Sequence, residues 1–498
     1  MKNHKFIKTI LSKYTVLALQ LFTSAFFLYY CNKVLSGKWF YTATAVLVLV
    51  WVLFLAMLSR KGKRGKLSKT AIVTKIVSIL VSILLLLGTK YVARGDDFIN
   101  DITNKTEETH IVSVRVLKSS GITKLSQIQN KPCAVSYQHD TSNVTKAISE
   151  FEKQKGSDFN LVKKDDYKGV LDALYNKTAK AIIIGNEYLG LVEDQYTQFR
   201  SDTVEIANFK IKKKMDQVTK PTKVTKEPFT VYLTGIDTYG DIDEVARSDV
   251  NLLLTVNPTT KQMLIVSIPR DMQVTLASYN AMDKLTHSGI YGVDETIKTI
   301  EKFLSVDVNY WARTNFSGMK DIIDQLDGVT IYSPYKDFRT LHGDYLITKG
   351  EHKMFGDQAL SFVRERYRLP DGDYDRGRNQ QRLLKAMMSK AMSPKIITNF
   401  SNILSAIEGT FETNMSNKEI RSLLNMQMDD MAGWDIVNAQ VSGSPSYTLE
   451  AYSSKGHRTY VTIPNKKSVQ KTEELIKKIL ANDKLTKEDL KGANGEEQ

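Results

Sequence analysis

The clearest structural signal in this chain lies in residues 229–271, FTVYLTGIDTYGDIDEVARSDVNLLLTVNPTTKQMLIVSIPRD. Three apolar, β-branched runs predict three consecutive strands, at residues 229–235, 250–256 and 263–268. Asn257 and Pro258 separate the last two runs and are typical of a tight turn. We therefore predict an antiparallel β-meander.

Charged residues gather at one edge of this predicted meander. The end of the first strand, the start of the second and the end of the third meet there, and they hold Asp237, Arg247, Asp249, Arg270 and Asp271. Carboxylate oxygens are ligands that Mg²⁺ prefers, and guanidinium groups bind phosphate oxygens. The pattern is compatible with a metal and phosphate site. The commoner explanation for charges at strand ends is solvated turn residues or structural ion pairs.

Three apolar stretches dominate the start of the chain, at about residues 14–30, 40–58 and 71–87. Each is long enough to cross a bilayer as a helix. A signal peptide is the alternative for the first stretch, but no small-residue cleavage site follows Tyr30 and two further stretches come directly after it. We predict a membrane anchor over residues 1–95 with three transmembrane helices.

Basic residues predict the orientation of this anchor. Four lysines precede the first stretch and six basic residues lie between the second and third, against two lysines between the first and second. Because basic loops stay in the cytoplasm, we expect a cytoplasmic N-terminus and an extracytoplasmic chain from about residue 91. This topology excludes ATP and chromosomal DNA as partners of the larger part of the chain.

The net charge of +14 is spread along the chain, and no helix-turn-helix, zinc-finger or aromatic RNA-binding motif accompanies it. Anionic lipid and anionic wall polymer account for the charge better than nucleic acid does. The two cysteines, Cys31 and Cys133, form neither a disulfide framework nor a metal motif.

Residues 101–209 alternate short apolar runs with helical stretches, which predicts a small α/β domain. The expected strands are residues 111–117, 133–137 and 181–185, and the expected helices are residues 142–153 and 165–176. The Lys-, Thr- and Pro-rich residues 210–228 are typical of a linker. Beyond the meander, we predict helices at residues 284–304 and 318–326, strands at residues 308–314 and 329–333, and a structural role for His287.

The second informative stretch is GDQALSFVRERYRLPDGDYDRGRNQQRLLK, residues 356–385. We predict a short helix at residues 357–362 and an extended segment at residues 363–368, because Pro370 prevents a continued helix. In that segment Arg364 and Arg366 would share one face and Glu365 would point away. On the following helix Arg376 and Gln380 are four residues apart and share a face. This pattern favours anion binding over a solvated basic helix face.

At this point the chain resembles the LytR-CpsA-Psr family, most closely its capsule-assembly members, which have three membrane spans and an additional extracytoplasmic domain. The resemblance covers residues 229 to about 392 and rests on five motifs in family order: GID at 235–237, ARSD at 246–249, IPRD at 268–271, VRER at 363–366 and DRGRNQQ at 375–381. One departure is Asn379, where the family often has arginine.

The resemblance implies an α/β/α domain at residues 229–480 with a central mixed sheet, followed by a polar tail at residues 481–498. It implies an apolar pocket that holds a polyprenyl chain with the pyrophosphate at its mouth. We expect the apolar residues of the second and third meander strands to line that pocket. It also implies that the small domain is the accessory domain of the capsule-type members.

The resemblance further implies a Mg²⁺-dependent phosphotransferase that moves capsular polysaccharide, or a related glycopolymer, from undecaprenyl pyrophosphate onto peptidoglycan at the cell membrane. Other capsule-assembly membrane proteins are further candidate partners. Asp237 and Asp249 match the metal-associated aspartates, and Gln380 matches a polar site residue. The pyrophosphate-side arginines match Arg247, Arg270, Arg364, Arg366 and Arg376. Asp237 and Asp271 are both candidates for the general base.

A protein of another class is the main alternative: a non-catalytic regulator or tether that binds polyprenyl-linked polymer, or binds DNA. A DNA-binding role requires basic residues on the cytoplasmic side, where the predicted topology leaves only the head and one short loop. A tether would not require aspartates and arginines at one sheet edge.

The predicted topology can be tested with reporter fusions. A reporter that is active only outside the cytoplasm should work when it is fused after Gly95 or at the C-terminus, and it should be silent between Arg60 and Lys69. Activity within the Arg60 to Lys69 loop would reverse the orientation and remove the wall-directed function.

Overall fold

The computed structural model describes residues 12–34, 37–60, 69–137, 140–155, 159–216, 220–236, 242–393, 408–454 and 458–493. The chain divides into two compact units. The first unit comprises Met1–Thr103, Met392–Glu408 and Ser416–Ala432, and the second comprises Asn104–Ala391, Gly409–Met415 and Gly433–Gln498.

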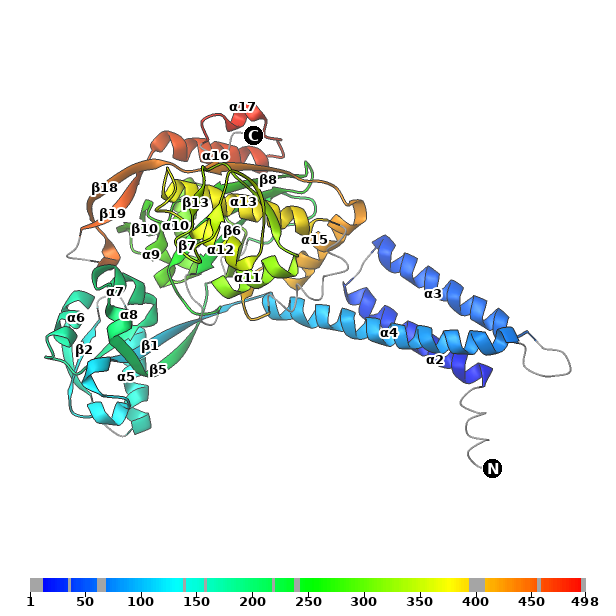
Figure 1. Cartoon of the computed structure of the whole chain (residues 1–498), viewed down its shortest axis with the longest axis horizontal. Coiled ribbons are helices and arrows are strands. Elements are labelled where there is room, and N and C mark those ends of the chain that lie inside the picture. Colours follow the sequence, from blue (N-terminus) through cyan, green and yellow to red (C-terminus); the bar gives the residue numbers. More distant parts are fainter. Residues whose placement is uncertain are drawn as a thin grey trace. The chain divides into compact units, whose positions relative to one another are not determined.

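The first unit is built on three long helices, α2 (Lys13–Val34), α3 (Gly37–Leu58) and α4 (Lys69–Ile102). Figure 1 shows them running side by side. All three are long and apolar enough to cross a membrane, so the three predicted apolar helices are present. Helix α4 nevertheless continues well past residue 87, so the predicted end of the anchor at residue 95 falls inside a helix.

The extension of α4 is explained by packing and charge. Phe98, Ile99 and Ile102 are buried on this part of the helix. Asp96 forms ion pairs with Lys33 at 3.4 Å and with Arg421 of helix α15 (Asn417–Asp430), which belongs to the same unit. The hydrophobic pattern of the sequence predicted only the apolar run and not this amphipathic continuation of the helix.

The small domain in the second unit has a five-stranded sheet in the order β3-β2-β4-β1-β5. Its strands are β1 (Glu107–Leu117), β2 (Pro132–Ser136), β3 (Asn160–Lys164), β4 (Ala181–Gly185) and β5 (Thr203–Lys214). Helices α5 (Thr141–Lys155) and α6 (Tyr167–Tyr175) contribute to separate hydrophobic clusters, with α5 in one and α6 in the other. The three predicted strands and both predicted helices are therefore present.

Strand β5 corrects the predicted linker at residues 210–228. Residues 210–214 belong to β5 and pair with the start of β1, where Lys214 lies opposite Glu107. Ile211 is buried between lysines that are exposed or half-buried. The strand alternation was hidden by lysines, which are common on edge strands because they discourage further pairing.

The larger domain is organised on a six-stranded sheet in the order β16-β11-β6-β7-β8-β17. Its strands are β6 (Phe229–Ile236), β7 (Ser248–Asn257), β8 (Gln262–Ser267), β11 (Tyr310–Thr314), β16 (Phe411–Thr413) and β17 (Asp435–Gln440). The pairs β6–β7 and β7–β8 are antiparallel, which confirms the predicted meander. The pairs β11–β6 and β8–β17 are parallel, so the sheet is mixed as predicted.

Helices cover both faces of this sheet, so the domain has the predicted α/β/α architecture. On one face, Tyr232, Leu253 and Leu264 pack in a core with helices α10 (Val293–Leu304) and α16 (Lys466–Leu480). The other face lies toward α11 (Phe316–Gln325), α12 (Gly356–Arg364) and α13 (Asp373–Ala391). Side chains alternate between the two faces because successive residues of a strand point in opposite directions.

The single helix predicted at residues 284–304 is wrong. Lys284 ends strand β10 (Met282–Lys284), short helix α9 (Leu285–Ser288) follows, and α10 begins after Gly292. Gly292 has a φ of 104°, and a Cβ there would lie 2.2 Å from a carboxylate oxygen of Glu108. The chain therefore needs glycine at this break, both for its backbone angle and for the close approach of β1.

The predicted polar tail at residues 481–498 is also partly wrong. Leu485 and Ala493 are buried in the core of the larger domain, and helix α17 (Lys487–Leu490) lies between them. The Gln262 side-chain amide donates to the Leu485 carbonyl at 3.1 Å. Two buried apolar residues and this hydrogen bond attach a segment that is otherwise charged to the larger domain.

Gly356 offers a test of how closely α11 and α12 pack. A Cβ at Gly356 would lie 2.6 Å from the backbone carbonyl oxygen of Lys320 in α11. We expect Gly356→Ala to lower the free energy of unfolding by about 1–3 kcal/mol, as overpacking usually does. Denaturant unfolding of the purified chain measures this change.

Gly433→Ala is the matched control, because no atom lies within 4 Å of a Cβ at that position. It should change the free energy of unfolding by less than about 0.5 kcal/mol. Equal stabilities for the two variants would show that the helices have room to separate.

Candidate functional site

The meander brings Asp249 and Arg270 together at one edge of the sheet. Asp249 is the second residue of β7, and Arg270 follows the end of β8. The Arg270 Nη1 donates to Asp249 Oδ1 at 2.8 Å, and Thr286 Oγ1 donates to the same oxygen at 3.1 Å. The charge groups predicted at the start of the second strand and at the end of the third therefore meet, whereas Asp237, at the end of the first strand, lies outside the described residues.

Asp271 occupies the centre of a second set of cations. Lys284 Nζ lies 3.1 Å from Asp271 Oδ1, and Arg270 Nε lies 4.0 Å from the same atom. Arg366 Nη1 approaches Asp271 Oδ2 at 4.0 Å. The sequence reasoning missed Lys284, because its position was assigned to a helix. In the structure β10 pairs with β9 (Gln273–Thr275), which places Lys284 beside Asp271.

The electrostatics keep both carboxylates ionised. Burial alone would raise the pKa of Asp249, but Arg270, Arg247 and Arg376 outweigh it and lower that pKa below its usual value. Burial likewise opposes ionisation of Asp271, and Lys284 and Arg270 lower its pKa. These carboxylates remain negative at neutral pH and hold the surrounding cations in place.

Arg270 retains a donor for a ligand. Its Nε is buried, and among the described residues it has no hydrogen-bond acceptor. An unsatisfied buried N–H is costly, so a group that supplies an acceptor there gains free energy. Pyrophosphate oxygens are acceptors of this kind, and charge-assisted bonds from arginine to phosphate are strong.

The sequence predicted that Arg364 and Arg366 share one face of an extended segment. In the structure they do not. Helix α12 continues through Arg364, whose guanidinium lies 4.2 Å from the ring centroid of Phe316. Arg366 stacks on Tyr367 at 4.5 Å and faces Asp271. Glu365 is buried rather than outward.

Glu365 explains this local structure. Its carboxylate accepts backbone hydrogen bonds from Leu341 at 2.6 Å, Arg366 at 3.0 Å and Arg368 at 3.2 Å. Three backbone donors satisfy a buried charge that would otherwise be unfavourable. Glu365 thereby ends the helix and fixes the loop that carries Arg366.

The motif residues of helix α13 have two roles: some hold the helix against the sheet and its own N-terminal loop, and others face the site. Gln381 donates to the carbonyls of Ile265 and Ala439, at 3.0 and 2.6 Å, and so attaches the helix to β8 and β17. Arg378 pairs with Asp371 at 2.7 Å and Asp375 at 2.6 Å, which is a structural role.

Arg376 and Gln380 lie on the site side of α13. Arg376 pairs with Asp373 at 2.6 Å, and its charge contributes to lowering the pKa values of Asp249 and Asp271. Gln380 lines the neighbouring cavity. Asp373 is the first residue of α13.

Arg247 reaches the small domain. Its Nη1 donates to Asp194 Oδ2 at 3.0 Å, and Asp194 belongs to helix α7 (Leu189–Gln195). A Cβ at Gly190 of the same helix would lie 2.5 Å from the Arg247 guanidinium. The small domain therefore contacts one arginine of the site directly.

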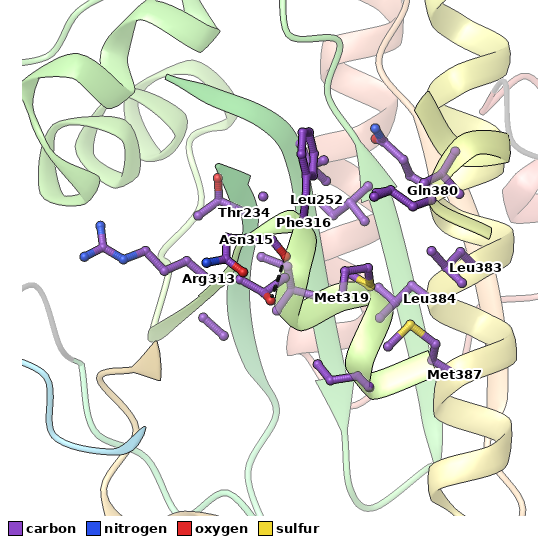
Figure 2. Close-up of a pocket in the computed structure, with 18 of the residues that line it drawn as sticks. Thr234, Leu252, Arg313, Asn315, Phe316, Met319, Gln380, Leu383, Leu384 and Met387 are labelled. Atoms are coloured by element: carbon purple, nitrogen blue, oxygen red, sulfur yellow. Dashed lines mark hydrogen bonds between the residues drawn. The ribbon is translucent and has the colours of Figure 1, made fainter. Parts of the chain in front are cut away.

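An apolar cavity of about 180 Å³ opens beside this charged edge. Figure 2 shows Met319 of α11 and Leu383, Leu384 and Met387 of α13 along it. Leu233, Val250, Leu252 and Ala312 contribute from the sheet. Polar groups at the cavity include Thr234, Asn315, Arg364 and Gln380.

The strand contribution to this cavity differs from the prediction. The second meander strand lines it through Val250 and Leu252. No residue of the third strand lines it, and Leu264 and Val266 of that strand are buried in the core on the opposite face. Arg313 touches the cavity, but its guanidinium extends away from the other labelled side chains and pairs with Glu412 (Figure 2).

A metal ligand set is incomplete within the described part of the chain. No group of three or more His, Cys, Asp or Glu residues there is arranged to hold an ion. Asp249 has the right chemistry for one Mg²⁺ ligand, since it is an ionised hard oxygen donor. The second proposed ligand, Asp237, lies outside the described residues.

His287 is buried, and its Nδ1 is hydrogen-bonded to Asp283 at 2.6 Å and to Ser453 at 2.8 Å. These contacts are consistent with the predicted structural role.

Comparison with known proteins identifies this domain. The model of the LytR_cpsA_psr family matches residues 194–478, which is more than half of the chain. A second model, described as DNA polymerase processivity factor, matches residues 68–184, which join helix α4 to the first part of the small domain. This smaller match by itself assigns neither an activity nor a partner.

Related proteins cover the same domain. A polyisoprenyl-teichoic acid–peptidoglycan teichoic acid transferase, TagU, from Bacillus cereus is 34% identical over 224 residues, or 42% of this chain and 72% of the relative. A crystal structure of a Streptococcus agalactiae protein has 26% identity and a TM-score of 0.45, covering 52% of this chain and 90% of that one. Bacillus subtilis TagV has 26% identity and a TM-score of 0.44, covering 52% and 99%. With its family model and its motifs in order, the chain belongs to the LytR-CpsA-Psr family.

Proposed function

We propose that this chain is a membrane-anchored transferase that moves a glycopolymer from a polyprenyl pyrophosphate carrier onto peptidoglycan. The observation that carries the proposal is an apolar cavity that opens beside a buried edge of arginines and aspartates. The name of the Bacillus cereus relative, a polyisoprenyl-teichoic acid–peptidoglycan transferase, supports the same donor and acceptor classes. Capsular polysaccharide is the glycopolymer we infer from the motif resemblance.

The two parts of the site suit the two parts of such a donor. An apolar cavity shields a hydrocarbon chain from water, and that burial favours binding in proportion to the area covered. Arg270 and Arg366 would bind the pyrophosphate at the edge, since Arg270 Nε is a buried donor without an acceptor among the described residues. Val250 lies in the cavity and Asp249 in the charged edge, so adjacent residues of β7 join the two parts.

The proposed reaction is a phosphoryl-group transfer. A peptidoglycan hydroxyl attacks the sugar-linked phosphorus, a new O–P bond forms, and the bond from that phosphorus to the bridging oxygen breaks. Undecaprenyl phosphate leaves with that oxygen, and the hydroxyl proton passes to a base. Negative charge develops on the leaving group, so arginines already fixed around it lower the barrier.

The electrostatics of the site narrow the choice of residue for the general base. Asp271 has a lowered pKa because Lys284 and Arg270 stabilise its ionised form. A carboxylate stabilised in this way accepts a proton poorly. Asp271 is therefore better suited to positioning Lys284 and Arg366 than to accepting the hydroxyl proton.

Mg²⁺ is the cofactor we propose, held by Asp249 and Asp237. When bound, it would neutralise charge on the phosphate oxygens. We also propose that the N-terminus is cytoplasmic and that the transfer site lies outside the cytoplasm, next to the peptidoglycan acceptor. The three apolar helices support membrane attachment.

The transfer can be tested with the purified full-length chain in detergent. It is incubated with lipid-linked polymer, Mg²⁺ and peptidoglycan fragments, and products are detected by mass. We expect a product in which the fragment gains the polymer and one phosphate. Binding of the lipid-linked polymer with no such product would favour a non-catalytic tether.

Variants at the charged edge separate the proposed roles. Arg366→Ala should weaken donor binding about ten- to a hundredfold, because a charge-assisted hydrogen bond contributes about 1.5–3 kcal/mol. Arg366→Lys should restore little, since an ammonium cannot reproduce the planar fork. Asp249→Asn keeps a side-chain oxygen that can accept from Arg270 and Thr286, so it should retain donor binding and lose both Mg²⁺ stimulation and transfer.

Arg368→Ala is the matched control on the same loop, because the Arg368 guanidinium donates to the Arg339 carbonyl at 3.1 Å. It should bind donor and transfer polymer like the wild type. Wild-type transfer by Asp249→Asn, with unchanged Mg²⁺ dependence, would contradict the metal assignment.

A further inference from the structure

A second cavity, of about 240 Å³, lies between the small domain and the larger domain within the second unit. Strand β1 and the short helix Asn186–Tyr188 line it from the small domain, and α10 lines it from the larger one. The transfer reaction described above uses none of its residues. Six of its lining residues carry carboxylates: Glu108, Asp140, Glu187, Asp216, Asp294 and Glu295.

Two of these carboxylates have an oxygen that lacks a partner. Asp140 Oδ2 and Glu187 Oε2 are buried and, within the part of the chain that the structure describes, accept no hydrogen bond. Asp140 is 8% exposed and Glu187 is 3% exposed. Buried carboxylate oxygens are nearly always bonded in folded proteins, so each of these two oxygens can accept a hydrogen bond from a molecule bound in the cavity.

The cations around the cavity compensate its carboxylates incompletely. The lining contains four basic residues against the six acidic ones: His110, Lys213, Lys214 and Lys298. Lys298 is engaged by Asp216 at 2.8 Å. His110 Nδ1 lies 3.0 Å from Glu187 Oε1, and Nε2 lies 3.8 Å from Glu108 Oε1.

The pKa values of the residues that line the cavity agree with this excess of negative charge. Burial, together with Glu187, raises the pKa of Asp140 to about 7. Burial, together with Glu108, raises the pKa of Asp294 to about 7. Burial alone would lower the pKa of His110, but hydrogen bonds to Glu108 and Glu187 raise it to about 9. His110 therefore stays charged at neutral pH, and the neighbouring cations do not offset the effect of burial on the pKa values of Asp140 and Asp294.

Aromatic rings line part of the same cavity. Tyr279 and Tyr291 are tilted against each other with ring centroids 4.6 Å apart, and Tyr188 lies on the small-domain side. Rings beside carboxylates are typical of sites for organic cations, because the ring face attracts positive charge. The described residues contain no group of three or more His, Cys, Asp or Glu arranged to hold a metal ion.

We propose that this interdomain cavity binds a protonated primary amine carried by a small polar molecule, such as an amino sugar or the side chain of a basic amino acid. Its ammonium group would donate to Asp140 Oδ2 and Glu187 Oε2, and the tyrosine rings would cover its carbon skeleton. The proposal does not depend on the transfer reaction, because the residues differ and the test measures binding alone.

Calorimetry on the full-length chain in detergent at pH 7.0 tests this proposal. The probes are glucosamine and Nα-acetyl-lysine amide, each beside its neutral counterpart, N-acetylglucosamine or Nα,Nε-diacetyl-lysine amide. We expect at least one amine to bind and its acetylated counterpart to bind at least tenfold more weakly. The arm that binds distinguishes an amino sugar from an amino acid side chain.

Isosteric variants locate the binding. Asp140→Asn and Glu187→Gln should each weaken the amine about ten- to a hundredfold, as expected for the loss of a charge-assisted bond. Asp216→Asn is the matched control, because Asp216 is already paired with Lys298. It should change the affinity less than threefold. Melting curves of each variant show whether it is folded.

Three results would overturn the proposal. The amines could bind no more tightly than their neutral counterparts, or could show no binding up to 50 mM, a concentration that corresponds to a binding free energy of about −1.8 kcal/mol. Both isosteric variants could bind like the wild type. Finally, stabilisation by MgCl₂ or CaCl₂ with no binding of either amine would assign the cavity to a metal ion instead.

Discussion

The ion pair between Asp249 and Arg270 is the contact on which the charged site depends. It joins the start of β7 to the end of β8 at 2.8 Å, and both side chains are about 15% exposed or less. Taking two charges out of water is expensive, so such a pair is retained only when its geometry is good and further partners satisfy it. Thr286, Arg376 and Arg247 supply that support.

The same sheet that holds this pair also provides the apolar cavity. One face is filled by α10 and α16, whereas the other receives α11, α12 and α13 with space left between side chains. Because neighbouring residues of β7 alternate between faces, Val250 and Leu252 reach the cavity while Leu253 reaches the core. One strand therefore contributes to the apolar cavity through Val250 and Leu252 and to the charged edge through Asp249.

The small domain contacts the larger domain both at the charged site and at helix α10. Asp194 and Gly190 of α7 contact Arg247, and Glu108 of β1 accepts the backbone N–H of Val293 at the start of α10. The Arg247 pair involves an exposed aspartate, so its own contribution to stability is small. Its effect is to place an arginine of the site within reach of a second domain.

Much of this architecture could be predicted because its signals are local. Strand alternation gave the meander, and the meander alone explains why Asp249 and Arg270 meet. Contacts between distant segments could not be predicted: Lys284 reaches Asp271 only through the pairing of β9 with β10. Glu365 was assigned to the outside because its burial depends on backbone donors from Leu341, Arg366 and Arg368. The lysines of β5 concealed a strand whose pairing is set by β1.

The proposed donor site is tested most directly by an experimental structure of the full-length chain with geranylgeranyl pyrophosphate, a short polyprenyl pyrophosphate. We predict that the hydrocarbon chain lies between α11 and α13 against Val250 and Leu252, with a phosphate oxygen accepting from Arg270 Nε. A pyrophosphate bound away from Arg270 and Arg366, with the hydrocarbon chain outside this cavity, would contradict it.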